Sequence, residues 1–222
     1  MLFALGKPVA FAALVVAFLL GLVLRAVAIR LTARTLGVAD RRESIAPRLR
    51  EDIDPFGAVA AALGGMGWGK MISVDEVSRH RGRARAAAVF AAGPLTCIVA
   101  AEILFGVYAL LFPDNLLAFY GPADVFYGLG LPAGELALLS FAVGLLFFGL
   151  LALIPIPPLD GFGILYYALR RPGAGMQWMR LWFEDKNIGV LVLLILCLFP
   201  FGGPFLLQIL NILGLLFLRV WS

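Results

Sequence analysis

The sequence predicts an all-α polytopic membrane protein, organised as a single membrane domain over residues 1–222. Hydrophobic residues make up 62% of the 222-residue chain and charged residues only 14%, and the mean hydropathy is +0.98. A soluble domain of this length could not bury so much apolar surface, so helices that cross a bilayer are expected. The apolar residues fall into four long runs. We expect these runs to span the membrane at about 8–28, 86–112, 136–154 and 188–220.

The first apolar run begins at Pro8 and carries no charge before Arg25. With the residues up to Ala28 it reaches about 20 residues, the length needed to cross the hydrocarbon core. Proline suits the first helical turn, where a missing N–H costs little. The N-terminus shows no small-residue cleavage site, so we interpret this run as a retained span and not as a signal peptide.

Residues 30–85 are expected to form a cytoplasmic loop. The part from Arg30 to Pro55 is dense in both charge signs, which is typical of a solvated stretch with short helical pieces. Phe56–Gly69 is apolar but short and rich in glycine, so it favours a segment that enters the membrane against protein and returns. Lys70–Val74 alternates enough to predict a short strand.

The distribution of cations predicts the orientation. Of the 18 lysines and arginines, 15 lie in Arg30–Arg85 and Arg170–Lys186, and none lies in the loop Pro113–Glu135. Because cytoplasmic loops carry the excess of lysine and arginine, we expect the N-terminus outside and both basic stretches in the cytoplasm. We interpret the basic run near His80 as a membrane flank and not as a nucleic-acid site.

The C-terminal part predicts two short helices and a last apolar run. Asp160–Arg171 should form a helix at the inner leaflet, and Gln177–Lys186 an interfacial helix with two tryptophans. Ile188–Leu218 is uncharged but interrupted by F-P-F-G-G-P at Phe199–Pro204. The sequence leaves open whether this run is one kinked span or a hairpin of two helices.

The third span ends in a proline-rich turn with the sequence I-P-I-P-P-L-D-G. Its prolines remove backbone donors and forbid helix, and its glycine lets the chain change direction. An acid, Asp160, follows at the broken end of this membrane helix, and such an acid is a candidate functional site. The residues expected to shape the turn are Pro155, Pro157, Pro158 and Gly161.

Five short motifs occur in a fixed order along the chain. They are L-G-V-A-D-R-R after the first span, D-P-F-G at Asp54–Gly57, G-G-M-G-W-G-K at Gly64–Lys70, A-G-P at Ala92–Pro94, and P-I-P-P-L-D-G. In this order the motifs resemble the site-2 protease family of intramembrane zinc metalloproteases, in its compact bacterial form. The resemblance covers nearly the whole chain and implies a site-2-protease-like helical core in a bacterial cytoplasmic membrane.

In that family, zinc is held by two histidines of an H-E-x-x-H helix and by the aspartate of the L-D-G turn, and the glutamate activates water. Two imidazoles one turn apart and one carboxylate leave a fourth tetrahedral position for that water. When Ala33 and Gly37 are set on the family's small residues, the first histidine falls on Arg25, the glutamate on Ala26 and the second histidine on Ile29. The resemblance therefore implies a remnant of an active site without a catalytic residue.

No other register restores the zinc ligands, because His80 is the single histidine of the chain. A substitute site built from Cys97, Cys197 and Asp160 would need three distant residues to converge without a known ligand spacing. We therefore expect no metal and no cofactor.

A buried Asp160 without a metal needs another cation. We hypothesise that Arg25 supplies it, as an ion pair that replaces zinc as a structural tie. Arg30 is the rival partner. In the alternative, Arg25 extends to the cytoplasmic interface and Asp160 caps the following helix.

The sequence is compatible with three functions. The first is an inactive site-2-protease-like protein that acts as a binding, scaffold or accessory subunit, with transmembrane helices of other membrane proteins and the lipid bilayer as partners. The second is an active intramembrane metalloprotease with an atypical site. The third is a small transporter or ion pathway that uses Asp160 and Glu102, the acid inside the second span. The chain shows no inverted repeat, which disfavours the third.

Overall fold

The computed structural model describes residues 6–39, 44–77, 82–112, 120–127, 129–198 and 205–221. Within these ranges every regular element is a helix, which confirms the predicted all-α fold class. The strand expected at Lys70–Val74 is wrong for these residues, where the nearest ladder contact is an isolated bridge between Ile53 and Gly69. The Lys70 backbone pairs instead with the Asp52 carbonyl and with a guanidinium, so no second strand lies beside it.

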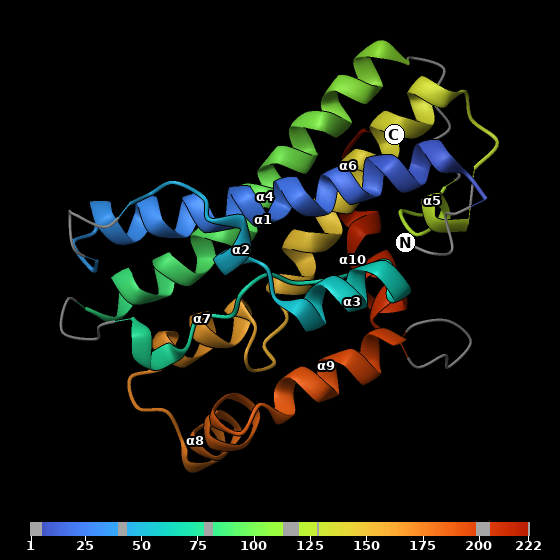
Figure 1. Ribbon diagram of the computed structural model, residues 1–222. Coiled ribbons are helices and arrows are strands. Elements are labelled where there is room, and N and C mark those ends of the chain that lie inside the picture. Colours follow the sequence, from blue (N-terminus) through green and yellow to red (C-terminus); the bar gives the residue numbers. More distant parts are fainter. Residues whose placement is uncertain are drawn as a thin grey trace.

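Three long helices form the body of the molecule and pack against one another (Figure 1). They are α1 (Pro8–Thr35), α4 (Arg83–Leu111) and α6 (Ala133–Ala152), and each is long and apolar enough to cross a membrane. The chain is therefore a polytopic membrane protein by helix length and composition. α1 begins at Pro8 and runs past the expected end at residue 28, because Ile29 and Ala33 stay buried on its inner face.

Small residues let the long helices approach closely, as is usual between membrane helices. A side chain at Gly144 of α6 would lie 2.6 Å from the Ala17 Cβ atom of α1, and one at Gly149 would lie 2.8 Å from the Pro94 carbonyl oxygen of α4. The remaining space is filled by buried aromatic rings, among them Phe126 and Phe147, whose centroids stack 5.8 Å apart.

The region between α1 and α4 holds two short helices, α2 (Leu49–Asp52) and α3 (Pro55–Gly64), and the 3-10 turn η2 (Val74–Glu76). With 10 residues, α3 is about 15 Å long, half of what a span needs. The chain then doubles back, since the Asp54 carboxylate accepts hydrogen bonds from Phe56 N (2.9 Å) and from Trp68 Nε1 (2.7 Å).

The C-terminal half begins with α5 (Asp124–Tyr127) before α6 and continues with α7 (Asp160–Ala168) after it. α8 (Ala174–Met179) leads into a π-helical turn, η4 (Arg180–Asp185). A smaller core around Phe90, Phe162 and Tyr167 seats α7 against α4. α7 thus begins at Asp160, as predicted, and lies beside the first part of α4 (Figure 1).

The last apolar run contains two separate helices, α9 (Ile188–Leu198) and α10 (Phe205–Leu218), followed by η5 (Arg219–Trp221). The interruption at Phe199–Pro204 lies outside the described residues. α9 packs beside α3, whereas α10 packs beside α6 and accepts a hydrogen bond at Asn211 from Ala123 N (2.8 Å). Each helix is shorter than a span and contacts a different part of the bundle.

Candidate functional site

The turn after α6 carries Asp160 back toward the long helices. The segment between α6 and α7 holds the three prolines, and the Pro157–Pro158 peptide is cis. A Cβ atom at Gly161 would lie 2.0 Å from the Leu153 carbonyl oxygen, so glycine alone fits against the end of α6. The Asp160 side chain is therefore buried, with 1% of its surface exposed.

Arg25 reaches the same place from α1. Its aliphatic stem lies against Gly93 of the A-G-P motif, where a Cβ atom would approach Arg25 Cγ to 2.6 Å. The missing side chain at Gly93 thus leaves the path along which the arginine extends. Only 8% of Arg25 is exposed, so the residue stays within the bundle and does not extend to an interface.

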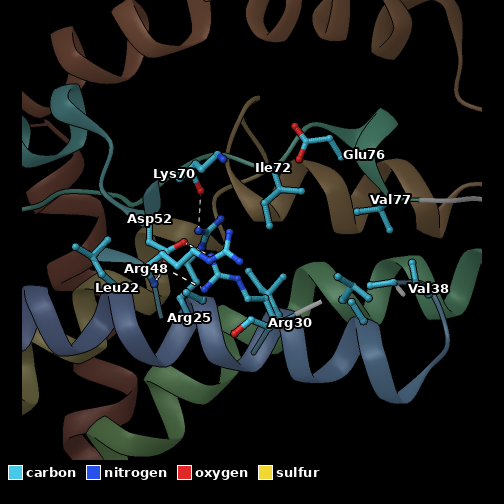
Figure 2. Close-up of a pocket in the computed structure, with 16 residues that line it drawn as sticks. Leu22, Arg25, Arg30, Val38, Arg48, Asp52, Lys70, Ile72, Glu76 and Val77 are labelled. Carbon is cyan, nitrogen blue, oxygen red and sulfur yellow. Dashed lines mark hydrogen bonds and ion pairs between the residues drawn. The ribbon is translucent and has the colours of Figure 1, made fainter. Parts of the chain in front are cut away.

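The structure brings Arg25 and Asp160 together in a bidentate ion pair. Arg25 Nε donates to Asp160 Oδ2 and Arg25 Nη2 to Asp160 Oδ1, both at 2.6 Å. The third nitrogen, Nη1, donates to the Lys70 carbonyl oxygen at 2.8 Å (Figure 2). Every nitrogen of the guanidinium has an acceptor, as a buried charge requires. The pair joins α1, the Lys70 segment and the start of α7.

Ala26 and Ile29 lie beside Arg25 on α1 and supply no polar atom. Ala26 is 8% exposed and Ile29 is 5% exposed. Ile29 belongs to the small core with Phe90 and Phe162. One helical turn after Arg25, the same face of α1 is therefore apolar.

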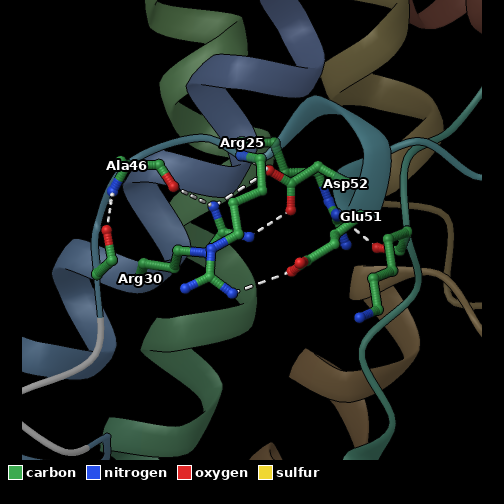
Figure 3. Close-up of polar contacts among 8 residues, drawn as sticks. Arg25, Arg30, Ala46, Glu51 and Asp52 are labelled. Atoms are coloured by element: carbon green, nitrogen blue, oxygen red, sulfur yellow. Dashed lines mark hydrogen bonds and ion pairs between the residues drawn. The ribbon is translucent and has the colours of Figure 1, made fainter.

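Arg30 binds a different acid, Asp52. Its Nη1 atom donates to Asp52 Oδ2 (3.1 Å) and to the Ala46 carbonyl oxygen (2.9 Å), and its Nη2 atom bonds to Asp52 Oδ1 (Figure 3). Arg48 N also donates to Asp52 Oδ2 at 2.7 Å. Asp52 is not among the site residues predicted from the sequence. The one available signal was its place in R-L-R-E-D-I-D, among several equivalent acids.

Glu102 does not join this cluster. It lies nine residues after Gly93 on α4, about 13 Å along the helix axis. Glu102 Oε2 accepts a hydrogen bond from Trp221 Nε1 at 2.9 Å, and Oε1 is buried without a partner in the described part of the chain. The two acids of the predicted ion pathway thus contact different elements, which disfavours a shared pathway.

The donor set does not fit a zinc ion. Among the described residues no three His, Cys, Asp or Glu side chains gather as a metal site, and His80 lies outside those residues. Both Asp160 oxygens already accept hydrogen bonds from a guanidinium, and Cys97 Sγ faces the Gly21 carbonyl oxygen at 3.6 Å. A catalytic zinc site usually uses three protein ligands, which these described residues do not supply.

Two cavities flank the segment Lys70–Ser73, which has no regular secondary structure. The first, here called the polar pocket, has a volume of about 560 Å³ and is lined by Arg30, Arg48, Asp52, Lys70, Glu76 and apolar residues of α1 (Figure 2). The second, here called the apolar groove, has a volume of about 680 Å³ and lies between α3 and α9. Its apolar lining includes Phe56, Met71, Leu191 and Leu194. Lys70 lines both cavities.

The segment Val74–Val77 forms one wall of the polar pocket through Glu76 and Val77, and it is hydrogen-bonded to the C-terminal half of the chain. Val74 N donates to Glu184 Oε1 at 2.8 Å, and Arg180 Nη1 donates to Asp75 Oδ1 at 2.7 Å. The Tyr167 hydroxyl donates to the carbonyl oxygens of Val74 and Val77. Burial raises the pKa of the Glu184 carboxyl above its ordinary value, and the hydrogen bond from Val74 N offsets part of that shift.

One comparison relates the chain to a known protein. It is 29% identical over 162 residues to a Bacillus subtilis (strain 168) protein named "Putative zinc metalloprotease YwhC", covering 72% of this chain and 67% of that protein. No family model matches the chain, and no solved structure matches it. The similarity and the three apolar helices support a metalloprotease-like membrane protein.

Proposed function

We propose that this protein is a catalytically inactive relative of the site-2 proteases, which binds a transmembrane helix of another membrane protein. Two observations support an inactive site: the Asp160 carboxylate is fully engaged by Arg25, and the neighbouring α1 positions are Ala26 and Ile29. Neither Ala26 nor Ile29 can activate water or hold zinc, and Asp160 would be one of the three protein ligands that a catalytic zinc site usually uses. The single observation that carries the proposal is the buried Arg25–Asp160 pair in place of a metal.

The Arg25–Asp160 pair supports a structural role for the position at which the site-2 proteases hold zinc. It joins α1 to the start of α7, and through the Lys70 carbonyl it also fixes the segment between the two cavities. Arginine stays charged and its planar guanidinium binds a carboxylate through two hydrogen bonds. It can therefore hold these elements together without a metal ion from solution. A protein that binds but does not cut needs such a fixed scaffold.

The apolar groove supports a helix-binding role. α3 and α9 are both apolar and shorter than a span, and we place the groove between them at the level of the bilayer. Phe56 and Leu191, on opposite sides of the groove, are 57% and 58% exposed. A concave apolar surface of this volume accepts the side chains of an apolar helix. We place the protein in a bacterial cytoplasmic membrane, with the N-terminus outside and the basic stretches in the cytoplasm.

The inactive site is tested by rebuilding the missing ligands. We expect native protein to contain no bound zinc by elemental analysis. The triple variant Arg25→His/Ala26→Glu/Ile29→His should bind about one zinc per chain, because two imidazoles one turn apart then face Asp160. Adding Asp160→Ala to the triple variant should remove that zinc. Near-stoichiometric zinc in the native protein, lost on Asp160→Ala, would contradict the proposal.

Helix binding is tested by photo-crosslinking in cells. A benzoylphenylalanine at Leu191 should capture a membrane protein through a residue within one of its transmembrane segments, as identified by mass spectrometry. Leu110 on α4, 83% exposed and outside the groove, is the matched control. Equal capture of the same proteins from both positions would argue against a specific groove.

A further inference from the structure

The apolar groove and the polar pocket meet at Lys70. The backbone of this residue is fixed on both sides, since Lys70 N donates to the Asp52 carbonyl oxygen (2.7 Å) and its own carbonyl accepts from Arg25 (2.8 Å). Its side chain is exposed and lines both cavities. A chain that leaves the groove toward the polar pocket must therefore pass the Lys70 ammonium.

Lys70 is the cation of the pocket that a ligand can pair with. The guanidinium of Arg25 is engaged by Asp160, that of Arg30 by Asp52, and that of Arg48 by Glu51 at 3.1 Å. Within the described ranges, the Lys70 ammonium has neither a hydrogen bond nor an ion pair. It is therefore the place where an incoming carboxylate gains an ion pair without breaking another.

Glu76 stands at the other end of the same wall (Figure 2). Its carboxylate is likewise exposed and without an ion pair among the described residues. Glu76 lies six positions after Lys70, and the chain between them has no regular structure until η2 begins at Val74. The wall therefore offers first a positive and then a negative charge along one direction.

Resting on the proposed function, we propose that the polar pocket selects partners by the charges that flank their transmembrane helix. The partner's transmembrane helix lies in the apolar groove. In the partner segment that follows this helix, an acidic residue pairs with Lys70 and a later basic residue pairs with Glu76. Cytoplasmic flanks carry an excess of lysine and arginine, and such a cation next to the helix end would meet the Lys70 ammonium. Like charges repel, so the pocket discriminates against the common flank and favours an acidic one.

The experiment uses two synthetic transmembrane peptides. Each has about 20 leucine and alanine residues and a fluorophore; one continues with Asp-Gly-Ser-Gly-Lys and the other with Lys-Gly-Ser-Gly-Asp. Association with labelled full-length protein is measured by energy transfer in phosphatidylcholine vesicles. We expect the Asp-first peptide to bind two- to fivefold more tightly, the size of an exposed ion pair. Lys70→Glu should reverse the preference.

Arg50→Glu is the matched control, because Arg50 is an exposed cation of α2 that lines neither cavity and should leave the preference unchanged. Leu191→Trp, which fills the groove, should weaken both peptides equally. If the two peptides bind wild type equally and Leu191→Trp still weakens them, charge selection is refuted while helix binding stands. If neither peptide binds, or Leu191→Trp has no effect, the helix-binding role itself fails.

Discussion

Two arginine–aspartate pairs on α1, five residues apart, differ in what surrounds them. Arg25–Asp160 has side-chain exposures of 9% and 1%, whereas Arg30–Asp52 has 27% and 9%. Both are bidentate, so geometry alone does not distinguish them. Water can replace a lost partner at Arg30 but not at Arg25. The comparison teaches that the deeper pair is a structural element of the fold, while the outer one mainly shapes the rim of a pocket.

The largest effect is expected from Asp160→Ala. The substitution leaves the Arg25 guanidinium buried without its acid, which costs about 3–5 kcal/mol of stability. Thermal or denaturant unfolding in detergent would measure this loss. The double variant Arg25→Met/Asp160→Leu should recover most of it, because an apolar pair of similar volume removes both charges. If Asp160→Ala is as stable as wild type, the Arg25–Asp160 ion pair does not stabilise the fold.

A smaller effect is expected from Asp52→Asn. The amide can still accept hydrogen bonds from Arg30 and Arg48 N, but the charge is lost and the pair is partly open to water. We expect a loss of about 1–2 kcal/mol, measured as for Asp160→Ala. A loss equal to that of Asp160→Ala would contradict the difference between the two sites.

Glu184 sharpens the comparison, because it is a partly buried carboxyl without a bidentate guanidinium. Burial raises its pKa, so the folded state binds a proton more readily than the unfolded state. Stability should therefore fall as pH rises from the unfolded value near 4.5 through the raised folded value. Glu184→Gln should flatten this part of the pH profile. An unchanged slope in the variant would show that Glu184 does not cause it.

The smallest effect is expected from Arg48→Ala. Arg48 and Glu51 are 54% and 55% exposed and lie three residues apart. Pairs of this kind contribute less than about 0.5 kcal/mol, and the Arg48 N–H to Asp52 does not depend on the side chain. Unfolding at two salt concentrations should show no difference beyond this size. If Arg48→Ala loses more stability than Asp52→Asn, the exposed Arg48–Glu51 pair would contribute more than the Arg30–Asp52 pair, contrary to this prediction.

The sequence predicted the long helices because their apolar runs are set by composition and length. It also pointed to Arg25 and Asp160 as partners, although only through the resemblance, since 135 residues separate them. It did not predict that Arg30 binds Asp52, because several acids in that stretch are equivalent by sequence. It misjudged Lys70–Val74, where alternation predicted a strand.

What the sequence by itself determined is local: apolar length, proline breaks, the distribution of cations, and the lack of a second histidine. Only the tertiary structure decided which charges meet, how deeply they lie, and that Lys70 stands between two cavities. The physical reason is that burial and pairing depend on chain segments far apart in sequence, and Gly93 and Gly161 act by leaving space for them.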